Sequence, residues 1–204
     1  MGRYQLDFQV YARTPPGIYS FQVQSSDRAI GAQASFGRLR IAATRPPDPA
    51  GQPAVALAAS LEDGIDLVGF TLRNASGRPI DVIRAGESVT LDLYWRARHK
   101  TEREYTVFTH LVGQAYNPAT AGPLWAGHDS QPLSGGYPTS QWFVNETIVD
   151  RHTLTVDAQT PPGEYELEVG MYLLETMKRL SVVDAQGQEV DNRIVLGRFQ
   201  VVHP

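Results

Sequence analysis

Thr14-Pro15-Pro16-Gly17-Ile18-Tyr19 returns later in the chain as Thr160-Pro161-Pro162-Gly163-Glu164-Tyr165, at an offset of 146 residues. Apolar positions around the motif repeat at the same offset: Phe8 corresponds to Leu154, Val10 to Val156, Ala12 to Ala158, Phe21 to Leu167 and Val23 to Val169. A second repeat, Phe36-Gly37-Arg38-Leu39 against Leu196-Gly197-Arg198-Phe199, has an offset of 160 residues. The end of the chain therefore repeats its beginning.

The repeat predicts three parts in the chain. We expect residues 1–43 to be the C-terminal strands of a preceding β-sandwich copy, and residues 55–204 to be a complete β-sandwich module. Residues 44–54 between them form a proline-rich linker. Its prolines lack amide donors and fix φ, so this segment cannot enter the interior of a sheet and should run extended.

Most apolar residues alternate with period two, which is typical of strands with one buried face. Val89, Leu91, Leu93 and Trp95 give the clearest example, and their shared face makes Trp95 a core residue. Further strands are expected over residues 5–10, 67–72, 105–112, 124–129, 148–156, 165–173 and 193–202. The sequence thus predicts an all-β fold, an antiparallel Ig-like or jelly-roll-like β-sandwich with almost no helix.

The repeated Thr-Pro-Pro-Gly turn leads into a strand that opens with Tyr19 in the first copy and Tyr165 in the second. Tyrosines at this place resemble the tyrosine corner of Ig-like sandwiches, where the hydroxyl bonds to the backbone of the turn. We expect both tyrosines to be buried in this way. Phe8, Val10, Phe21 and Val23 would also need cover, either from the second module or from a neighbouring chain in a homodimer through residues 1–43.

Composition excludes several classes of function. The net charge of −4 gives no electrostatic footprint for nucleic acid, and no run of about 18 apolar residues predicts a membrane span. Cysteine is absent, which removes disulfides, zinc–thiolate sites and cysteine nucleophiles. We expect no cofactor.

Residues able to bind metal gather between positions 110 and 152. They are His110, His128, Asp129, Asp150 and His152. Two neighbouring strands could bring three of them together as a structural or hydrolytic metal site. The same residues could instead form a hydrogen-bonded cluster that fixes the long loop 130–147 onto the sandwich, because polar groups on an apolar face need partners.

Three aromatic residues, Trp125, Tyr137 and Trp142, lie in or beside this Gly- and Pro-containing loop. Aromatic rings exposed on a loop can stack on the faces of sugars, which makes these residues candidates for binding a ligand. The alternative is that they pack against the end of the sandwich.

One family resemblance rests on a set of short motifs. They are Trp95, the strand Tyr105-Thr106-Val107-Phe108-Thr109-His110-Leu111, His128-Asp129-Ser130, Tyr137-Pro138-Thr139 with Trp142, and Asp150-Arg151-His152. Together they resemble the C-terminal extracytoplasmic β-sandwich module of large bacterial, Chloroflexi-type membrane proteins. Many of those are predicted dolichyl-phosphate-mannose-type glycosyltransferases. The resemblance implies an extracytoplasmic accessory domain that brings no catalytic residues with it.

These observations favour a non-catalytic interaction domain that contacts a glycan or another β domain of the parent protein. The sequence leaves two alternatives open. One is a metal-assisted hydrolase that uses the His and Asp residues named above, and the other is a purely structural spacer.

Overall fold

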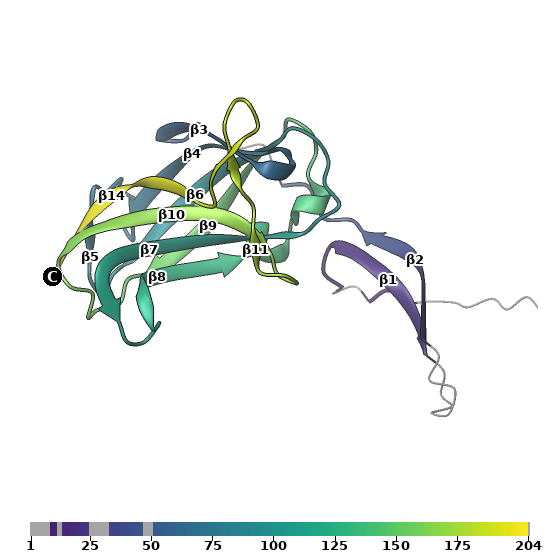
Figure 1. Ribbon diagram of the computed structural model, residues 1–204, viewed down its shortest axis with the longest axis horizontal. Coiled ribbons are helices and arrows are strands. Elements are labelled where there is room, and N and C mark those ends of the chain that lie inside the picture. Colours follow the sequence, from purple (N-terminus) through teal and green to yellow (C-terminus); the bar gives the residue numbers. More distant parts are fainter. Residues whose placement is uncertain (1–8, 12–13, 25–32, 47–50, 204) are drawn as a thin grey trace, which may run out of the picture.

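A computed structural model describes residues 9–11, 14–24, 33–46 and 51–203. In this part of the chain two six-stranded sheets pack face to face as a β-sandwich, and a separate two-stranded hairpin projects from one end of it (Figure 1). Neighbouring strands pair antiparallel except β5 and β14, which are parallel. The expected antiparallel β-sandwich is therefore confirmed.

One sheet has the strand order β5-β14-β10-β7-β8, with β11 added beside β10. Its strands are β5 (Val82–Arg84), β14 (Ile194–Val202), β10 (Gly163–Leu173), β7 (Tyr105–Asn117), β8 (Gly122–Ser130) and β11 (Lys178–Arg179). The other sheet has the order β13-β12-β3-β4-β6-β9. Its strands are β13 (Glu189–Asp191), β12 (Val182–Val183), β3 (Val55–Leu61), β4 (Ile65–Asn74), β6 (Ser88–Ala97) and β9 (Thr147–Thr155).

The described helices are short 3-10 turns in the connections. They are η1 (Glu62–Gly64), η2 (Pro132–Gly135) and η3 (Thr139–Gln141). Both η2 and η3 belong to the long connection from β8 to β9, which crosses from one sheet to the other at the end of the sandwich. Because β8 and β9 are the edge strands of their sheets, this connection and the two strands close one side of the fold.

The core forms where the period-two faces of the two sheets meet. Leu91, Leu93 and Trp95 of β6 are completely buried there, as the alternation predicts. They pack with Leu167 and Val169 of β10 from the facing sheet in one hydrophobic cluster. Burying each such side chain stabilises the fold by about 1.5–3 kcal/mol, so this interface holds the two sheets together.

The projecting hairpin consists of β1 (Gly17–Gln24) and β2 (Gln33–Ile41). Of the expected strand over residues 5–10, positions 1–8 lie outside the described residues, and Gln9 and Val10 are not in a strand. The hairpin pairs in the register of β10 and β14. Gly17 faces Ile41 and Tyr19 faces Leu39, while at the repeat offsets Gly163 faces Val201 and Tyr165 faces Phe199. The sequence repeat is thus also a repeat of strand pairing.

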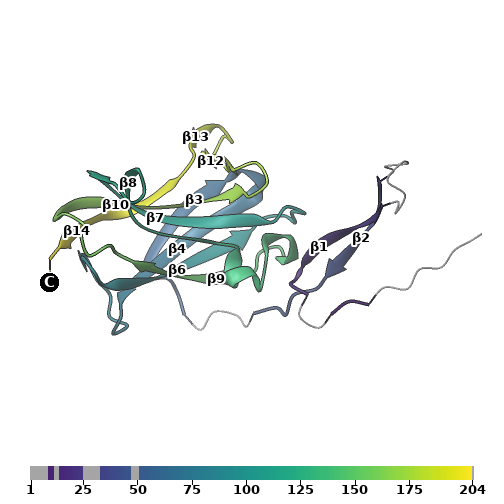
Figure 2. The same cartoon turned by 90° about the horizontal axis from the view of Figure 1, so that it is seen from below.

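Both repeated turns form the same tyrosine corner. The Tyr165 hydroxyl donates to the carbonyl oxygen of Pro161 at 2.8 Å, and the Tyr19 hydroxyl donates to that of Pro15 at 2.9 Å. Their burial differs, because Tyr165 is 3% exposed whereas Tyr19 is 39% exposed. Val10 is also exposed, so the expectation that the second module covers these side chains is wrong for Tyr19 and Val10. The pair β10–β14 lies within the sandwich, whereas the β1–β2 hairpin lies beyond its end (Figure 2).

Candidate functional site

The five residues expected to act as one polar cluster form two groups on opposite faces of a sheet. His128 and Asp129 are neighbours in β8, where they pair with Thr109 and Phe108 of β7. Because adjacent residues of a strand point to opposite faces, His128 turns inward between the sheets while Asp129 turns outward. Asp129 joins His110 on the outer face, and His128 joins Asp150 and His152 inside.

The inner group is a chain of three side chains that connects the two edge strands. His152 Nε2 donates to Asp150 Oδ2 at 2.8 Å, and His128 Nδ1 lies 2.8 Å from His152 Nδ1. Since one nitrogen of His152 carries the proton given to Asp150, its Nδ1 accepts from the Nδ1–H of His128 when His152 is neutral. Asp150 and His152 have no exposed surface. This chain therefore fastens β8 to β9 from within.

Asp150 also holds the long connection in place. Its second oxygen, Oδ1, accepts from the backbone amide of Leu133 at 2.8 Å. Leu133 and the following Ser134 both have left-handed backbone angles, with φ of 52° and 54°. Such angles are costly for residues other than glycine and persist where the surroundings impose them. The Asp150 carboxylate thus accepts one hydrogen bond at each oxygen and fixes the strained turn at the start of η2.

Burial lowers the pKa of His128 below its ordinary value, and the adjacent His152 ring lowers it further. Protonation of His128 to its charged form would place a positive charge beside a second imidazole in a partly buried site. The inner group therefore favours uncharged His128 near neutral pH.

The outer group has the opposite electrostatic character. His110 Nε2 donates to Asp129 Oδ1 at 3.0 Å, while its Nδ1 lies 3.8 Å from the buried carboxylate of Glu168. Burial lowers the pKa of His110, but the hydrogen bonds to Asp129 and Glu168 outweigh it and raise the pKa above its ordinary value. Arg193 Nε at 3.1 Å from Glu168 adds a further cation to this face.

Sequence reasoning missed a third polar group, centred on Asp92 of β6. Arg151 donates to both Asp92 oxygens, at 2.6 and 3.1 Å, and Arg73 donates to one of them. Although burial raises the pKa of Asp92, the two arginines outweigh it and hold the pKa below its ordinary value. Arg151 therefore points away from its neighbour Asp150. The sequence feature that could have revealed this group is Asp92 itself, an acidic residue in the middle of β6, a strand with a neighbour on each side.

The three aromatic candidates are buried: Trp125 is 6% exposed, and Tyr137 and Trp142 are each 2% exposed. Trp142 Nε1 donates to the Tyr137 carbonyl oxygen, and the Tyr137 hydroxyl donates to the buried Glu146 carboxylate. Trp125 Nε1 donates to the carbonyl oxygen of Ala115. Of the two readings, the packing alternative is the one that the structure shows, because these rings lie against the end and edge of the sandwich and are not exposed on the loop. Tyr137 and Trp142 have no open face for stacking.

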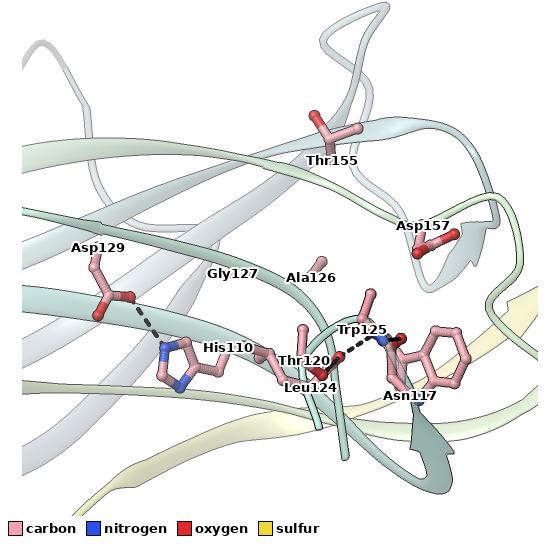
Figure 3. A pocket seen from close by; sticks show the side chains of 11 residues that line it. His110, Asn117, Thr120, Leu124, Trp125, Ala126, Gly127, Asp129, Thr155 and Asp157 are labelled. Atoms are coloured by element: carbon pink, nitrogen blue, oxygen red, sulfur yellow. Dashed lines mark hydrogen bonds and ion pairs between the residues drawn. The ribbon is translucent and has the colours of Figure 1, made fainter. Parts of the chain in front are cut away.

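A pocket of about 550 Å³ lies beside Trp125, along the edge strand β8 (Figure 3). Its polar lining comes from β7, the β7–β8 turn, β8 and the end of β9: His110, Asn117, Thr120, Asp129, Thr155 and Asp157. Leu124 and Trp125 supply its apolar lining. Asp157 uses one carboxylate oxygen to accept from the backbone amide of Gln159, at 2.8 Å. The pocket thus combines hydrogen-bonding groups with an apolar wall.

Asp150 and His152 do not belong to this pocket, since they lie inside the sandwich. Within the described ranges, no three His, Asp or Glu side chains are placed to hold one metal ion. No described helix is long and apolar enough to cross a membrane.

Comparisons with known proteins add the likeness of two solved structures. No protein-family model matches the chain, and no curated protein matches it. The C-terminal domain of Wzt is 14% identical, with a TM-score of 0.46, over 74% of this chain and 82% of that one. A CARDB domain from Pyrococcus furiosus, solved in complex with di-metal ions, is 12% identical, with a TM-score of 0.35, over 74% of this chain and 95% of that one.

Proposed function

We propose that this chain is a non-catalytic interaction module that binds a neutral glycan in the pocket beside Trp125. The observation that carries the proposal is the composition of that pocket. Asp129, Asp157 and Thr120 offer oxygen atoms to hydroxyl groups, and Leu124 and Trp125 offer an apolar wall. Two carboxylates in the lining disfavour an anionic ligand and suit a polyhydroxylated, uncharged one.

The arrangement of the acid–base groups supports binding in preference to catalysis. A general base needs a position from which it can reach a substrate proton. Asp150 and His152 are fully buried and bonded to each other and to the protein. His110 and Asp129 do line the pocket, but His110 Nε2 donates to Asp129 Oδ1, so this nitrogen is not open to take up a substrate proton. These side chains stabilise the fold around the pocket.

The family resemblance supports a place for the module in the cell. We propose that it belongs to the extracytoplasmic part of a membrane-attached bacterial protein whose remainder is a glycosyltransferase. The module would then hold a glycan near that enzyme. Protease digestion of intact cells that carry the tagged full-length protein tests this location, because an extracytoplasmic module is cleaved without lysis and a cytoplasmic one is not.

The binding proposal is tested by calorimetry against a panel of neutral oligosaccharides based on mannose, galactose and glucose. We expect one class to bind the parent chain and to bind Asp157→Asn roughly tenfold or more weakly, because a hydrogen bond to a charged group contributes about 1.5–3 kcal/mol. The amide of Asn keeps an oxygen for the Gln159 amide.

Asp184→Asn is the matched control. Asp184 also accepts from the backbone amide two residues later, that of Gln186, but it is not among the residues of this pocket. Its substitution should leave binding unchanged. Absence of binding across the panel, or equal weakening by both substitutions, would overturn the proposal.

A further inference from the structure

The two copies of the repeated hairpin differ in charge at four equivalent positions, which form two facing pairs on one face of each copy. In the second copy the pairs are Glu164 with Gln200 and Glu166 with Arg198. In the first copy they are Ile18 with Arg40 and Ser20 with Arg38. Two glutamates and one arginine give these positions a charge of −1 in the second copy, whereas two arginines give +2 in the first. The β1–β2 hairpin therefore carries excess positive charge on this face.

The difference removes the carboxylates that neutralise an arginine within the second copy. Arg198 Nη2 lies 3.1 Å from Glu166 Oε1, and its Nη1 lies 3.5 Å from Glu164 Oε1. The equivalent Arg38 pairs instead with a residue of the sandwich, because its Nη1 lies 2.7 Å from Oε2 of Glu102 in the connection between β6 and β7. The positive face of the hairpin thus contacts the sandwich.

A pocket of about 420 Å³ lies at this contact. Its lining comes from the hairpin and from the β6–β7 connection: Ile18, Arg38, Arg40, Lys100, Thr101 and Glu102. The Arg40 guanidinium donates to the carbonyl oxygen of Ser140, and Lys100 Nζ lies 5.6 Å from the centre of the Phe143 ring. Among the described residues, neither cation forms an ion pair with a carboxylate. Two positive charges therefore line the pocket without an acidic partner.

We propose that this pocket binds a phosphate group. A phosphate monoester carries a charge of about −1.5 to −2 at pH 7, which suits the two cations that lack an acidic partner. Its oxygens can accept charge-assisted hydrogen bonds from the Arg40 guanidinium and the Lys100 ammonium. This is a second site, since it shares no lining residue with the pocket beside Trp125.

Two carboxylates at this junction reduce the positive charge without cancelling it. Glu102 lines the pocket, and the hydrogen bond and charge of Arg38, with a smaller contribution from Arg40, hold its pKa below the ordinary value. Glu104 is not a lining residue, and its Oε1 accepts from the Ile18 amide and from the Ser140 hydroxyl, each at 3.0 Å. With both carboxylates counted against the three lining cations, a positive charge remains.

A phosphate in this pocket would also bridge two parts of the chain. Arg40 belongs to β2 of the hairpin, whereas Lys100 belongs to the sandwich. A ligand that accepts from both would draw the hairpin against the sandwich, so binding and docking of the hairpin should strengthen each other.

Inorganic phosphate serves as the probe, titrated into the full chain at constant ionic strength and followed by NMR of the backbone amides. We expect saturable shifts of the amides of residues 38–40 and 100–102. Lys100→Gln should bind roughly tenfold or more weakly, because it removes a charged donor. Arg84→Gln is the matched control, since it removes one charge at an exposed position of β5 outside this pocket, and it should bind as the parent chain does.

Sedimentation with phosphatidylcholine vesicles that contain phosphatidic acid distinguishes two sources of the phosphate group. Retention on these vesicles that is lost in Lys100→Gln would identify a lipid headgroup, and binding of free phosphate without retention would identify a soluble ester. Both results support the proposal.

Three outcomes would overturn it: absence of saturable shifts at these residues, equal weakening by Lys100→Gln and Arg84→Gln, or equally tight binding of acetate. Glycan binding beside Trp125 is measured separately, so each proposal can fail independently of the other.

Discussion

His128 Nδ1 lies 2.8 Å from His152 Nδ1, and this contact joins the edge strand of one sheet to the edge strand of the other. The strands β8 and β9 share no backbone ladder, so side chains hold this side of the sandwich closed. Asp150 completes the chain by accepting from His152. The arrangement makes the fold sensitive to the loss of His128.

His128→Ala should destabilise the protein by about 1–3 kcal/mol, because it leaves the buried Nδ1 of His152 without a donor. Urea unfolding followed by tryptophan fluorescence measures the change. His203→Ala, at an exposed position, is the control and should shift the midpoint little. Elemental analysis of both variants gives a second readout. Stoichiometric metal in the parent chain that disappears in His128→Ala would support the hydrolase alternative instead.

The two strand histidines should titrate on opposite sides of the ordinary histidine value of 6.5. We expect NMR titration to place His110 above it and His128 below it. The raised pKa of His110 contributes stability that is present below pH 6.5 and is lost as pH rises through the folded-state pKa. For His128 the sign is reversed: its contribution is present above pH 6.5 and is lost as pH falls through the folded-state pKa. Shifts in the same direction would contradict the two environments.

Asp92→Asn should reduce the loss of stability in acid. The folded-state pKa of Asp92 is below 3.8, so its contribution is present above that pH and is lost as pH falls through the folded-state pKa. Denaturation midpoints from neutral pH down to about pH 2 should fall less steeply in the variant, which lacks this titration. At neutral pH the variant should be the less stable protein, since Arg73 and Arg151 lose their charged partner. Parallel pH profiles would rule out this role for Asp92.

Tyr165→Phe and Tyr19→Phe remove equivalent hydroxyls from a buried and an exposed corner. The first should destabilise the sandwich by about 0.5–1.5 kcal/mol, the net contribution of one hydrogen bond. The second should leave the midpoint of the tryptophan-detected transition unchanged, because Trp95, Trp125 and Trp142 all lie in the sandwich. An unchanged midpoint for Tyr165→Phe would count against the corner as a stabilising element.

Gly113→Ala should destabilise by about 1–3 kcal/mol, because the added methyl group collides with the Tyr165 ring. Gly122→Ala, on the neighbouring strand, is a suitable control, since an added Cβ there meets only the Thr120 carbonyl oxygen at 3.8 Å. Thermal unfolding of both variants compares them. Similar melting temperatures would mean that the ring can move aside.

The sequence predicted the strands well because most of them have one apolar and one polar face. Leu91, Leu93 and Trp95 alternate as the core requires, and the Thr-Pro-Pro-Gly turns identified both tyrosine corners. The alternation of apolar and polar residues does not show which other residues cover the polar face of a strand. Asp92 is buried because two arginines distant in the sequence close over it, and such contacts depend on strand order, which local patterns do not contain.

The candidate site was predicted only in part. His128, Asp150 and His152 do come together, but Asp129 was grouped with them although a strand neighbour of His128 must face the other way. That alternation was available in the sequence and separates the two groups. The loop composition alone left open whether Tyr137 and Trp142 are exposed or packed against the end of the sandwich. Their burial depends on how the β8–β9 connection folds back over that end.

The contacts between the hairpin and the sandwich gather at one end. They include two ion pairs, Arg38 with Glu102 and Arg45 of the linker with Glu146, and a hydrogen bond from the Ile18 amide to Glu104. The Arg38–Glu102 pair is exposed at both ends, so it contributes little and weakens with salt, whereas the other pair joins a half-exposed Arg45 to the buried Glu146. Under mechanical tension along the chain, this junction should therefore yield long before the packed sheets. The hairpin and linker would then extend at low force, by roughly 3.5 Å for each residue that is freed. Force spectroscopy that showed a single rupture of the whole chain, with no earlier low-force extension, would exclude this behaviour.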